Sequence, residues 1–438
     1  MGIPYFLSLL DVKWDRSMLA DVRQPIPTVV SQHVEEAAAL RSTRTHLVSA
    51  PHVDRVHLGR WDERLAAHLD GVAVAGDLGA ELADAALESP GTGEMFVATV
   101  GAMQAGNSER LDRLFSIAEA APGAQAGLIS AFGWVSAPSL KGIVSELLRA
   151  DAPFRKRLGI AACALHRVDP GQVLGAVLSS PDALLRARSL RCAGEVGRVD
   201  RLPTCLAHLR DKDTACAFWA AWSAVLLGDR GEAFDSVRRL CLSLGPHRQR
   251  AARIVLKTLA SEDAHALMAA LAPNPANQRL LVQATGIAGN PFYVSWLIEQ
   301  MKGDKLARLA GESFSFITGL DLPYVDLERP QPEGAELGPT ESPEDENVEL
   351  DPDDGLPWPD PDKVRKWWSA NSHLFQPGVR HFMGKPPTWE HCLDVLRNGY
   401  QRQRIAAAEY LCLLRPGTPL FNTSAPAWRQ KRLLDKMH

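Results

Sequence analysis

The apolar positions along most of this chain recur with the spacing of an α-helix. From Glu94 to Gly303, apolar residues return at intervals of three and four positions, which places them on one face of each predicted helix. Val, Ile and Thr do not alternate with polar residues in the two-residue rhythm of a half-buried strand. The pattern therefore predicts an all-α protein without a β-sheet.

This helical pattern repeats about every thirty residues. Five clear copies begin at Pro153, Ala183, Thr214, Pro246 and Ala276, and two looser ones near Glu94 and Gly123. Each clear copy has a first helix of small residues, a break often made of Gly, Pro or Asp, and a second amphipathic helix. The first helices usually carry an arginine near their start, at Arg157, Arg188, Arg250 and Arg279. A helical hairpin of this size buries its apolar face only against its neighbours, so the repeat predicts a HEAT-like solenoid.

Both ends of the chain depart from the repeat. We expect an N-terminal helical cap over residues 1–90, with helices near His33–Thr45 and Leu58–Leu69 and a helix stop at Gly71. The repeat array then spans 91–320, an acidic insert rich in Pro and Trp spans 321–365, and C-terminal helices with a repeat-like cap span 366–438. The cap is predicted because QRQRIAAAEYLCLL, from Gln401, is similar to the first helix of a repeat copy.

The insert is unusual in charge and in proline content. Between Gln331 and Asp362 it has twelve Asp and Glu and no Lys or Arg, and removing these acids from the net charge of −4 leaves +8 on the rest of the chain. Nine prolines between Leu322 and Asp362 exclude a regular helix there. Asp360 is an N-cap residue and Pro361 suits a first helical turn, so KVRKWWSANSHLF is predicted to be helical.

The insert also holds the candidate binding residues. Its tryptophans are predicted to anchor an ordered insert to the array, because large aromatic side chains gain much from burial: Trp358, Trp367 and Trp368. The acids have no basic neighbours within the segment, so they either face water or meet basic groups elsewhere. If they face water, they are candidate partner-binding residues: Asp351, Asp353, Asp354, Glu346 and Glu349. The alternative is an insert that serves ordered packing alone.

Composition narrows the cellular setting. Apolar residues make up 46% and charged residues 23% of the chain, as in ordinary globular proteins. No apolar run reaches the roughly 18–20 residues of a membrane helix, and the start has no basic leader or cleavage site. Seven cysteines, an odd number, lie mostly in apolar helical stretches. These features indicate reduced thiols and a cytoplasmic protein with no membrane partner. The positive charge is spread thinly over the chain, so nucleic-acid binding is not favoured.

Two histidine patterns could suggest a metal site. The N-terminal region combines histidines with acids and arginine, and we expect a polar network that seals the first repeat: His33, Glu36, Asp62, Arg64 and His68. It lacks an HExxH zinc pattern. Two CxxH pairs, Cys163 with His166 and Cys205 with His208, could in principle form a Cys2His2 site, but they lie in different repeats and Cys is commonly a small core residue. We therefore predict no metal.

The chain shows no motif that carries a reaction. The acids from Asp351 to Asp362 fail the EF-hand register, and no phosphate-binding loop, dinucleotide fingerprint or GxSxG elbow occurs. We predict no cofactor and no catalytic residue. A repeat-based enzyme, such as a lyase or hydrolase, stays open as an alternative because catalytic triads are recognised by geometry rather than by order.

Several stretches together carry a family resemblance: QHVEEAAAL, LGRWDERLAAHLDGVAVAG, FSFITGLDL, EDENVELDPDDGLPWPDPDKVRKWW and QRQRIAAAEYL. They cover both ends and the middle of the chain, which resembles an uncharacterised proteobacterial family of HEAT-like repeat proteins. Members are often encoded among accessory components of type VI secretion effector clusters, and the family has no established active site to transfer. The resemblance implies a non-catalytic, chaperone-like adaptor in effector loading.

We expect such an adaptor to hold a partner protein, an effector or its loading machinery, against the concave face of the array. An immunity-type inhibitor that binds one toxin is the alternative within the binding class.

Overall fold

The computed structural model describes residues 24–335 and 351–437. These residues are mostly helical. The described ranges contain no β-strand, and their extended pairing is limited to two isolated bridges, Glu328 with Pro359 and Phe382 with Lys385. The all-α prediction is therefore confirmed.

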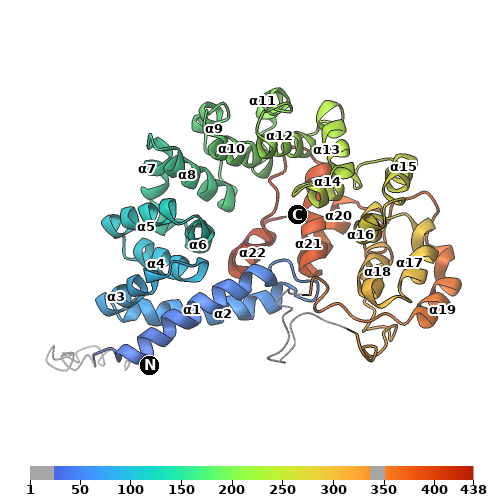
Figure 1. Cartoon of the computed structure of the whole chain (residues 1–438), viewed down its shortest axis with the longest axis horizontal. Coiled ribbons are helices and arrows are strands. Elements are labelled where there is room, and N and C mark those ends of the chain that lie inside the picture. Colours follow the sequence, from blue (N-terminus) through green and yellow to red (C-terminus); the bar gives the residue numbers. More distant parts are fainter. Residues whose placement is uncertain (1–23, 336–350, 438) are drawn as a thin grey trace, which may run out of the picture.

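Most of the helices form an arc of two rows, an inner and an outer one (Figure 1). The inner row consists of α4 (Thr92–Gln104), α6 (Gln125–Trp134), α8 (Pro153–His166), α10 (Ala183–Glu195), α12 (Thr214–Leu226), α14 (Arg248–Val255), α16 (Gln278–Ala288) and α18 (Asp304–Thr318). The outer row consists of α3 (Asp77–Ala85), α5 (Ser108–Ala120), α7 (Ile143–Arg149), α9 (Gln172–Val177), α11 (Leu202–Ala207), α13 (Glu232–Leu242), α15 (Ser261–Leu271), α17 (Val294–Gln300) and α19 (Pro361–Asn371). Each inner helix packs against the next one along the chain.

The predicted repeat positions agree with the inner helices. The copies expected at Pro153, Ala183 and Thr214 begin inner helices at those residues, and the two later copies begin within two residues of α14 and α16. Of the predicted segment boundaries, those at residues 90 and 320 fall between helices. The one at residue 365 falls inside α19, so the end of the acidic segment and the following helix are one element.

A long hairpin precedes the arc. It consists of α1 (Pro27–Leu47) and α2 (Arg55–Val74), so both predicted helices exist and both are longer than expected. The predicted stop at Gly71 is wrong, because α2 continues through it. A β-carbon at Gly71 would lie 2.8 Å from the imidazole of His33. Gly71 therefore gives room to a side chain of α1 rather than ending a helix.

The last part of the chain fills the inside of the arc. Helices α20 (Trp389–Asn398), α21 (Gln401–Leu414) and α22 (Ala427–Leu434) lie between the inner row and the hairpin (Figure 1). We call residues 378–434 the central segment. It contacts the inner row chiefly at helix C-termini, where the last backbone carbonyls have no partner inside their own helix.

Side chains of the central segment bind several of these carbonyls. Arg429 donates to the carbonyls of Gly133, Trp134 and Val135 at the end of α6, at 2.6, 3.1 and 2.7 Å. Arg380 donates to the carbonyl of Lys257 at 2.5 Å and to that of Ala288 at 3.2 Å. A guanidinium is well suited to this position, because positive charge is favourable at a helix C-terminus.

Backbone amides of the central segment bind other inner helices. Leu420 donates to the Glu195 carbonyl at 2.9 Å, His381 to that of Gly289 at 2.8 Å, and Met383 to that of Phe316 at 2.7 Å. Gly289 has a φ of 70°, and a β-carbon there would lie 2.1 Å from the His381 carbonyl oxygen. Glycine is thus required at position 289 both by the left-handed conformation and by the close approach of the backbone at His381.

The hairpin α1–α2 crosses the open side of the arc and is tied to the central segment. Asp62 is fully buried and accepts from Arg44 Nε at 2.6 Å and from the Ala427 amide at 2.7 Å. The Gln401 amide donates to the Val53 carbonyl at 2.7 Å. The chain therefore covers its own inner face. The expectation of a partner held against the concave face is wrong, because the central segment occupies that space.

Candidate functional site

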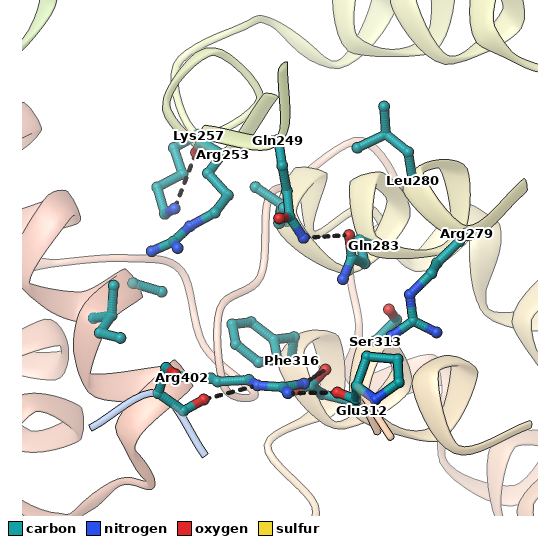
Figure 2. Close-up of a pocket in the computed structure, with 16 residues that line it drawn as sticks. Gln249, Arg253, Lys257, Arg279, Leu280, Gln283, Glu312, Ser313, Phe316 and Arg402 are labelled. Carbon is teal, nitrogen blue, oxygen red and sulfur yellow. Dashed lines mark hydrogen bonds and ion pairs between the residues drawn. The ribbon is translucent and has the colours of Figure 1, made fainter. Parts of the chain in front are cut away.

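A cavity lies where the central segment meets the last inner helices. It has a volume of about 440 Å³ and is bounded by α14, α16, α18 and α21 (Figure 2). Its polar lining has four cations and one carboxylate, beside four uncharged side chains: Arg253, Lys257, Arg279, Arg402, Glu312, Gln249, Gln283, Ser49 and Ser313. Its apolar lining includes Leu280, Ile287, Phe316 and Ile405. We call it the central cavity.

Two cations that line the central cavity share one carboxylate, Glu409, which is not itself a lining residue. Glu409, on α21, accepts from Arg253 Nη2 on α14 at 3.1 Å and from Lys257 Nζ, just after the end of α14, at 2.6 Å. Burial alone would raise the pKa of Glu409, but Arg253 and Lys257 together hold it below its usual value. Burial lowers the pKa of Lys257, and Arg253 adds to this while Glu409 opposes it. Both directions agree with an excess of cations around one carboxylate.

The opposite wall holds two one-to-one ion pairs. Arg402 donates to Glu312 at 2.9 Å and also binds the carbonyls of Ser49 and Pro352. Arg279 donates to both carboxylate oxygens of Asp353, at 2.8 and 2.5 Å. Burial raises the pKa of Glu312, and the neighbouring Arg402 opposes this shift. Glu312 is thus the lining carboxyl whose environment favours the protonated form.

The two hydroxyls of the lining are held in hydrogen bonds to backbone carbonyls. The sixteen residues of the lining include no His and no Cys, so neither lining hydroxyl has an imidazole base beside it within the lining. The Ser313 hydroxyl donates to the Val282 carbonyl at 2.9 Å, and the Ser49 hydroxyl donates to that of His46 at 3.2 Å. What the lining offers is a set of oriented donors beside an apolar floor.

A second, apolar pocket lies on the outer side of the arc. It has a volume of about 260 Å³ between α15, α16 and α17, and we call it the outer pocket. Its lining is rich in aromatic and sulfur-containing side chains: His265, Met268, Phe292, Tyr293 and Trp296. Phe292 is 70% exposed, and Tyr293 is held by a 2.6 Å hydrogen bond between its hydroxyl and His265. Side chains of these types are enriched at protein–protein interfaces.

The structure separates the acids predicted to bind a partner. Asp353 is only 3% exposed and is paired with Arg279, and Asp351 accepts from Arg308 at 2.6 Å. For these two the second alternative holds, because they meet basic groups elsewhere in the chain, arginines of the inner row. Asp354 is exposed. The other two candidates, Glu346 and Glu349, lie outside the described residues.

Asp353 and Asp354 form a natural matched pair for a test. Asp353→Ala should lower the free energy of unfolding by about 2–3 kcal/mol, because it leaves Arg279 without its bidentate partner. Asp354→Ala should change it by no more than about 0.5 kcal/mol. Urea denaturation of the two variants measures the difference, and equal effects would contradict the assigned ion pair.

The predicted tryptophan anchors all contact other parts of the chain. Trp358 is 8% exposed, with the guanidinium carbon of Arg308 at 4.9 Å from its ring centre. Trp367 packs edge-on against Phe314, and Trp368 packs against Phe375. The helix predicted after Asp360 is confirmed as α19. Asp360 caps it by accepting from the amides of Asp362 and Lys363, both at 3.0 Å.

The predicted N-terminal polar network divides into separate contacts. Asp62 binds Arg44 and the central segment, and Arg64 lies over the ring of Trp61. His33 and His68 meet through their Nδ1 atoms at 3.1 Å. Glu36 acts on this pair through its charge, which favours protonation of His68. A single connected network is therefore not formed.

The contact between His33 and His68 predicts that the stability of the fold depends on pH. Burial, together with His33, lowers the pKa of His68 below 6.5. The unfolded chain therefore binds this proton more readily, so the contribution of His68 to stability is complete above about pH 6.5 and declines below it. When the pH is lowered from about 7.5 to about 5.5, the urea concentration at the denaturation midpoint of the wild type should decrease. In His68→Gln it should decrease less. The exposed His46→Gln serves as control, and equal falls in all three would contradict this role.

The two CxxH pairs are not brought together. Cys163 and Cys205 are buried, and burial raises the pKa of their thiols to about 11 and about 12. His166 hydrogen-bonds the Phe132 carbonyl at 2.7 Å, and His208 bonds Asp211 at 3.1 Å. Over the ranges that the structure describes, no three His, Cys, Asp or Glu side chains gather as metal ligands do.

Most of the residues of the central cavity were missed by sequence reasoning. Arg279 was visible as one of the repeated arginines near helix starts. Glu409 had a weaker signal, as an acid within the small-residue stretch RIAAAEYL. Arg253, Lys257 and Arg402 resemble ordinary surface residues, because their role depends on which segment packs against them.

In the described part of the chain no helix has the length and apolarity to cross a membrane. Comparison of the chain with family models, with curated proteins and with solved structures found no match in any of the three.

Proposed function

We propose that this protein is a non-catalytic scaffold of the HEAT-like repeat class that binds a partner protein in the cytoplasm. Following the family resemblance, the proposed role is that of an accessory or chaperone-like adaptor in the loading of a type VI secretion effector. The observation that carries the binding role is the outer pocket, where Phe292 remains 70% exposed beside Tyr293 and Trp296. An exposed aromatic cluster around a preformed pocket is a typical protein-docking feature.

The central segment inside the arc also supports the outer side as the docking surface. Because the central segment covers the inner face, a folded partner meets the protein on its outer side. The stacked inner helices and the buried ion pairs hold that side as a rigid platform, which reduces the entropy lost when a partner docks. The outer pocket is the proposed centre of the contact.

The experiment compares two exposed apolar residues. Tagged wild-type protein, Phe292→Ser and Leu244→Ser are used to capture partners from the native cell, and the captured protein is then purified and its direct binding measured. Leu244 is 84% exposed on a loop away from the outer pocket. Phe292→Ser should weaken binding at least tenfold, or about 1.4 kcal/mol, and Leu244→Ser should not. Equal binding by all three proteins would contradict the proposal.

The same experiment separates the two binding roles. A partner that is a toxin, and that loses its activity when bound, supports the immunity-type alternative. A partner that stays active, or that belongs to the secretion apparatus, supports the adaptor.

The enzyme alternative has one specific residue to test. Glu312 lines the central cavity and its pKa is raised by burial, as is common for a general acid. Its carboxylate also has a structural partner in Arg402, which accounts for its position without a reaction. The binding role therefore stands first.

A further inference from the structure

We propose that the central cavity binds a small oxyanionic molecule, a carboxylate or a phosphate ester with a short apolar body. This inference goes beyond the scaffold role, because a scaffold needs no small ligand. It rests on the charge balance of the cavity, on donors directed into it, and on its size.

The cavity carries one positive charge more than its carboxylates balance. Four cations line it, and the described residues supply three carboxylates that contact them. The excess lies at the shared Glu409, which serves both Arg253 and Lys257. Lys257 has a side chain that is 2% exposed, so its charge is largely removed from water. An anion in the cavity would complete this charge balance, since buried charges require nearby opposite charges.

Donors that are not used elsewhere face the same space. The Arg253 guanidinium makes one hydrogen bond, through Nη2 to Glu409, and its Nε and Nη1 bond nothing in the described part of the chain. Gln283 accepts from Gln249 through its amide oxygen at 2.9 Å, which leaves its amide NH2 free to donate. Figure 2 shows Arg253 and Gln283 extending toward the open centre, with Arg402 and Phe316 along the opposite side. A guanidinium with an amide NH2 is a suitable donor set for carboxylate or phosphate oxygens.

The opposite side of the cavity supports the apolar body of such a ligand. Phe316 lies on that side, and Ile287 and Ile405 add apolar surface to the lining, so a planar or aliphatic group can pack against them while its anionic head meets Arg253 (Figure 2). The volume of about 440 Å³ lies within the range of small-molecule sites.

The test uses four probes with purified full-length protein. Phenyl phosphate and benzoate combine an oxyanion with an apolar ring, inorganic phosphate lacks the ring, and phenol lacks the charge. Calorimetry should find saturable binding of phenyl phosphate or benzoate at one site per chain, weaker binding of inorganic phosphate and none of phenol. The tighter of the two ring-bearing probes identifies the preferred head group.

Variants locate the site. Arg253→Gln should weaken binding of the preferred probe at least tenfold, and Gln283→Glu should abolish it by placing a negative charge beside the ligand. Arg210→Gln, at an exposed position on the outer side, should bind as wild type does. Should Arg253→Gln fail to fold, as judged by circular dichroism, Gln283→Glu decides alone. The proposal is overturned if none of the anionic probes binds at millimolar concentration, or if the folded cavity variants bind as wild type does.

Discussion

Asp62→Ala should lower the free energy of unfolding by about 3–5 kcal/mol, because it removes the acceptor at the centre of a fully buried cluster. Arg44 donates to Asp62 through Nε at 2.6 Å and through Nη2 at 3.3 Å, and the Ala427 amide donates to it at 2.7 Å. The variant leaves a guanidinium that is 7% exposed without its carboxylate, and a buried amide without its acceptor. Urea denaturation followed by far-ultraviolet circular dichroism measures the loss.

The control for this prediction lies on the same helix. Asp70 is exposed on α2, and Asp70→Ala should change stability by no more than about 0.5 kcal/mol. Similar midpoints for Asp62→Ala and wild type would contradict the description of the hairpin as tied to the central segment.

Glu409→Leu should cost a similar amount, about 3–5 kcal/mol, because it leaves Lys257 and Arg253 facing an apolar side chain. The structure also predicts how to restore the loss. Lys257→Met in the Glu409→Leu background removes the buried ammonium, so the double variant should recover a large part of the stability that the single variant loses. Arg253 keeps access to solvent, with 32% of its side chain exposed.

The same pair has a defined response to pH. The pKa of Glu409 is held below 4.5 in the folded chain by Arg253 and Lys257, against the effect of burial. Its contribution to stability is therefore complete above about pH 4.5 and is lost as the pH falls through the lowered folded-state pKa. The double variant should lose less stability on acidification than the wild type. A double variant no more stable than Glu409→Leu, or an identical acid response, would contradict the ion pair.

Local patterns explain what the sequence could predict. Apolar spacing placed the starts of α8, α10, α12, α14 and α16 to within two residues, because a helical face depends on neighbours three and four positions away. Asp360 and Pro361 located the start of α19, because capping is a contact between adjacent residues. Both signals are local in the chain, and the structure agrees with both.

Long-range packing explains what the sequence could not predict. Asp353 and Asp354 are chemically identical neighbours, yet only Asp353 is buried, where the distant Arg279 and Arg308 meet it. Gly71 resembled a helix stop, but it makes room for His33 on another helix. Arg429 resembled a surface residue, although it binds the end of α6 across almost 300 positions of sequence. In each case the partner is distant in the chain, and no repeat or spacing identifies it.

Residues 378–434 cover the inner face of the arc, and the rest of the molecule is held together through them (Figure 1). Hydrogen exchange tests this covering most directly in the irregular stretches of this segment, where no helix of their own protects the amides. The amides of His381, Met383 and Leu420 donate to carbonyls of the inner row.

Peptides that contain these three amides should exchange slowly in hydrogen-exchange mass spectrometry. The exposed loop at 243–245, just after α13, provides the fast reference in the same sample. All three amides should be protected in the wild type, and protection should be lost at Leu420 in Asp62→Ala, where the nearby attachment of Ala427 is removed. Exchange of these amides in the wild type as fast as in the reference loop would show that the central segment does not cover the inner face.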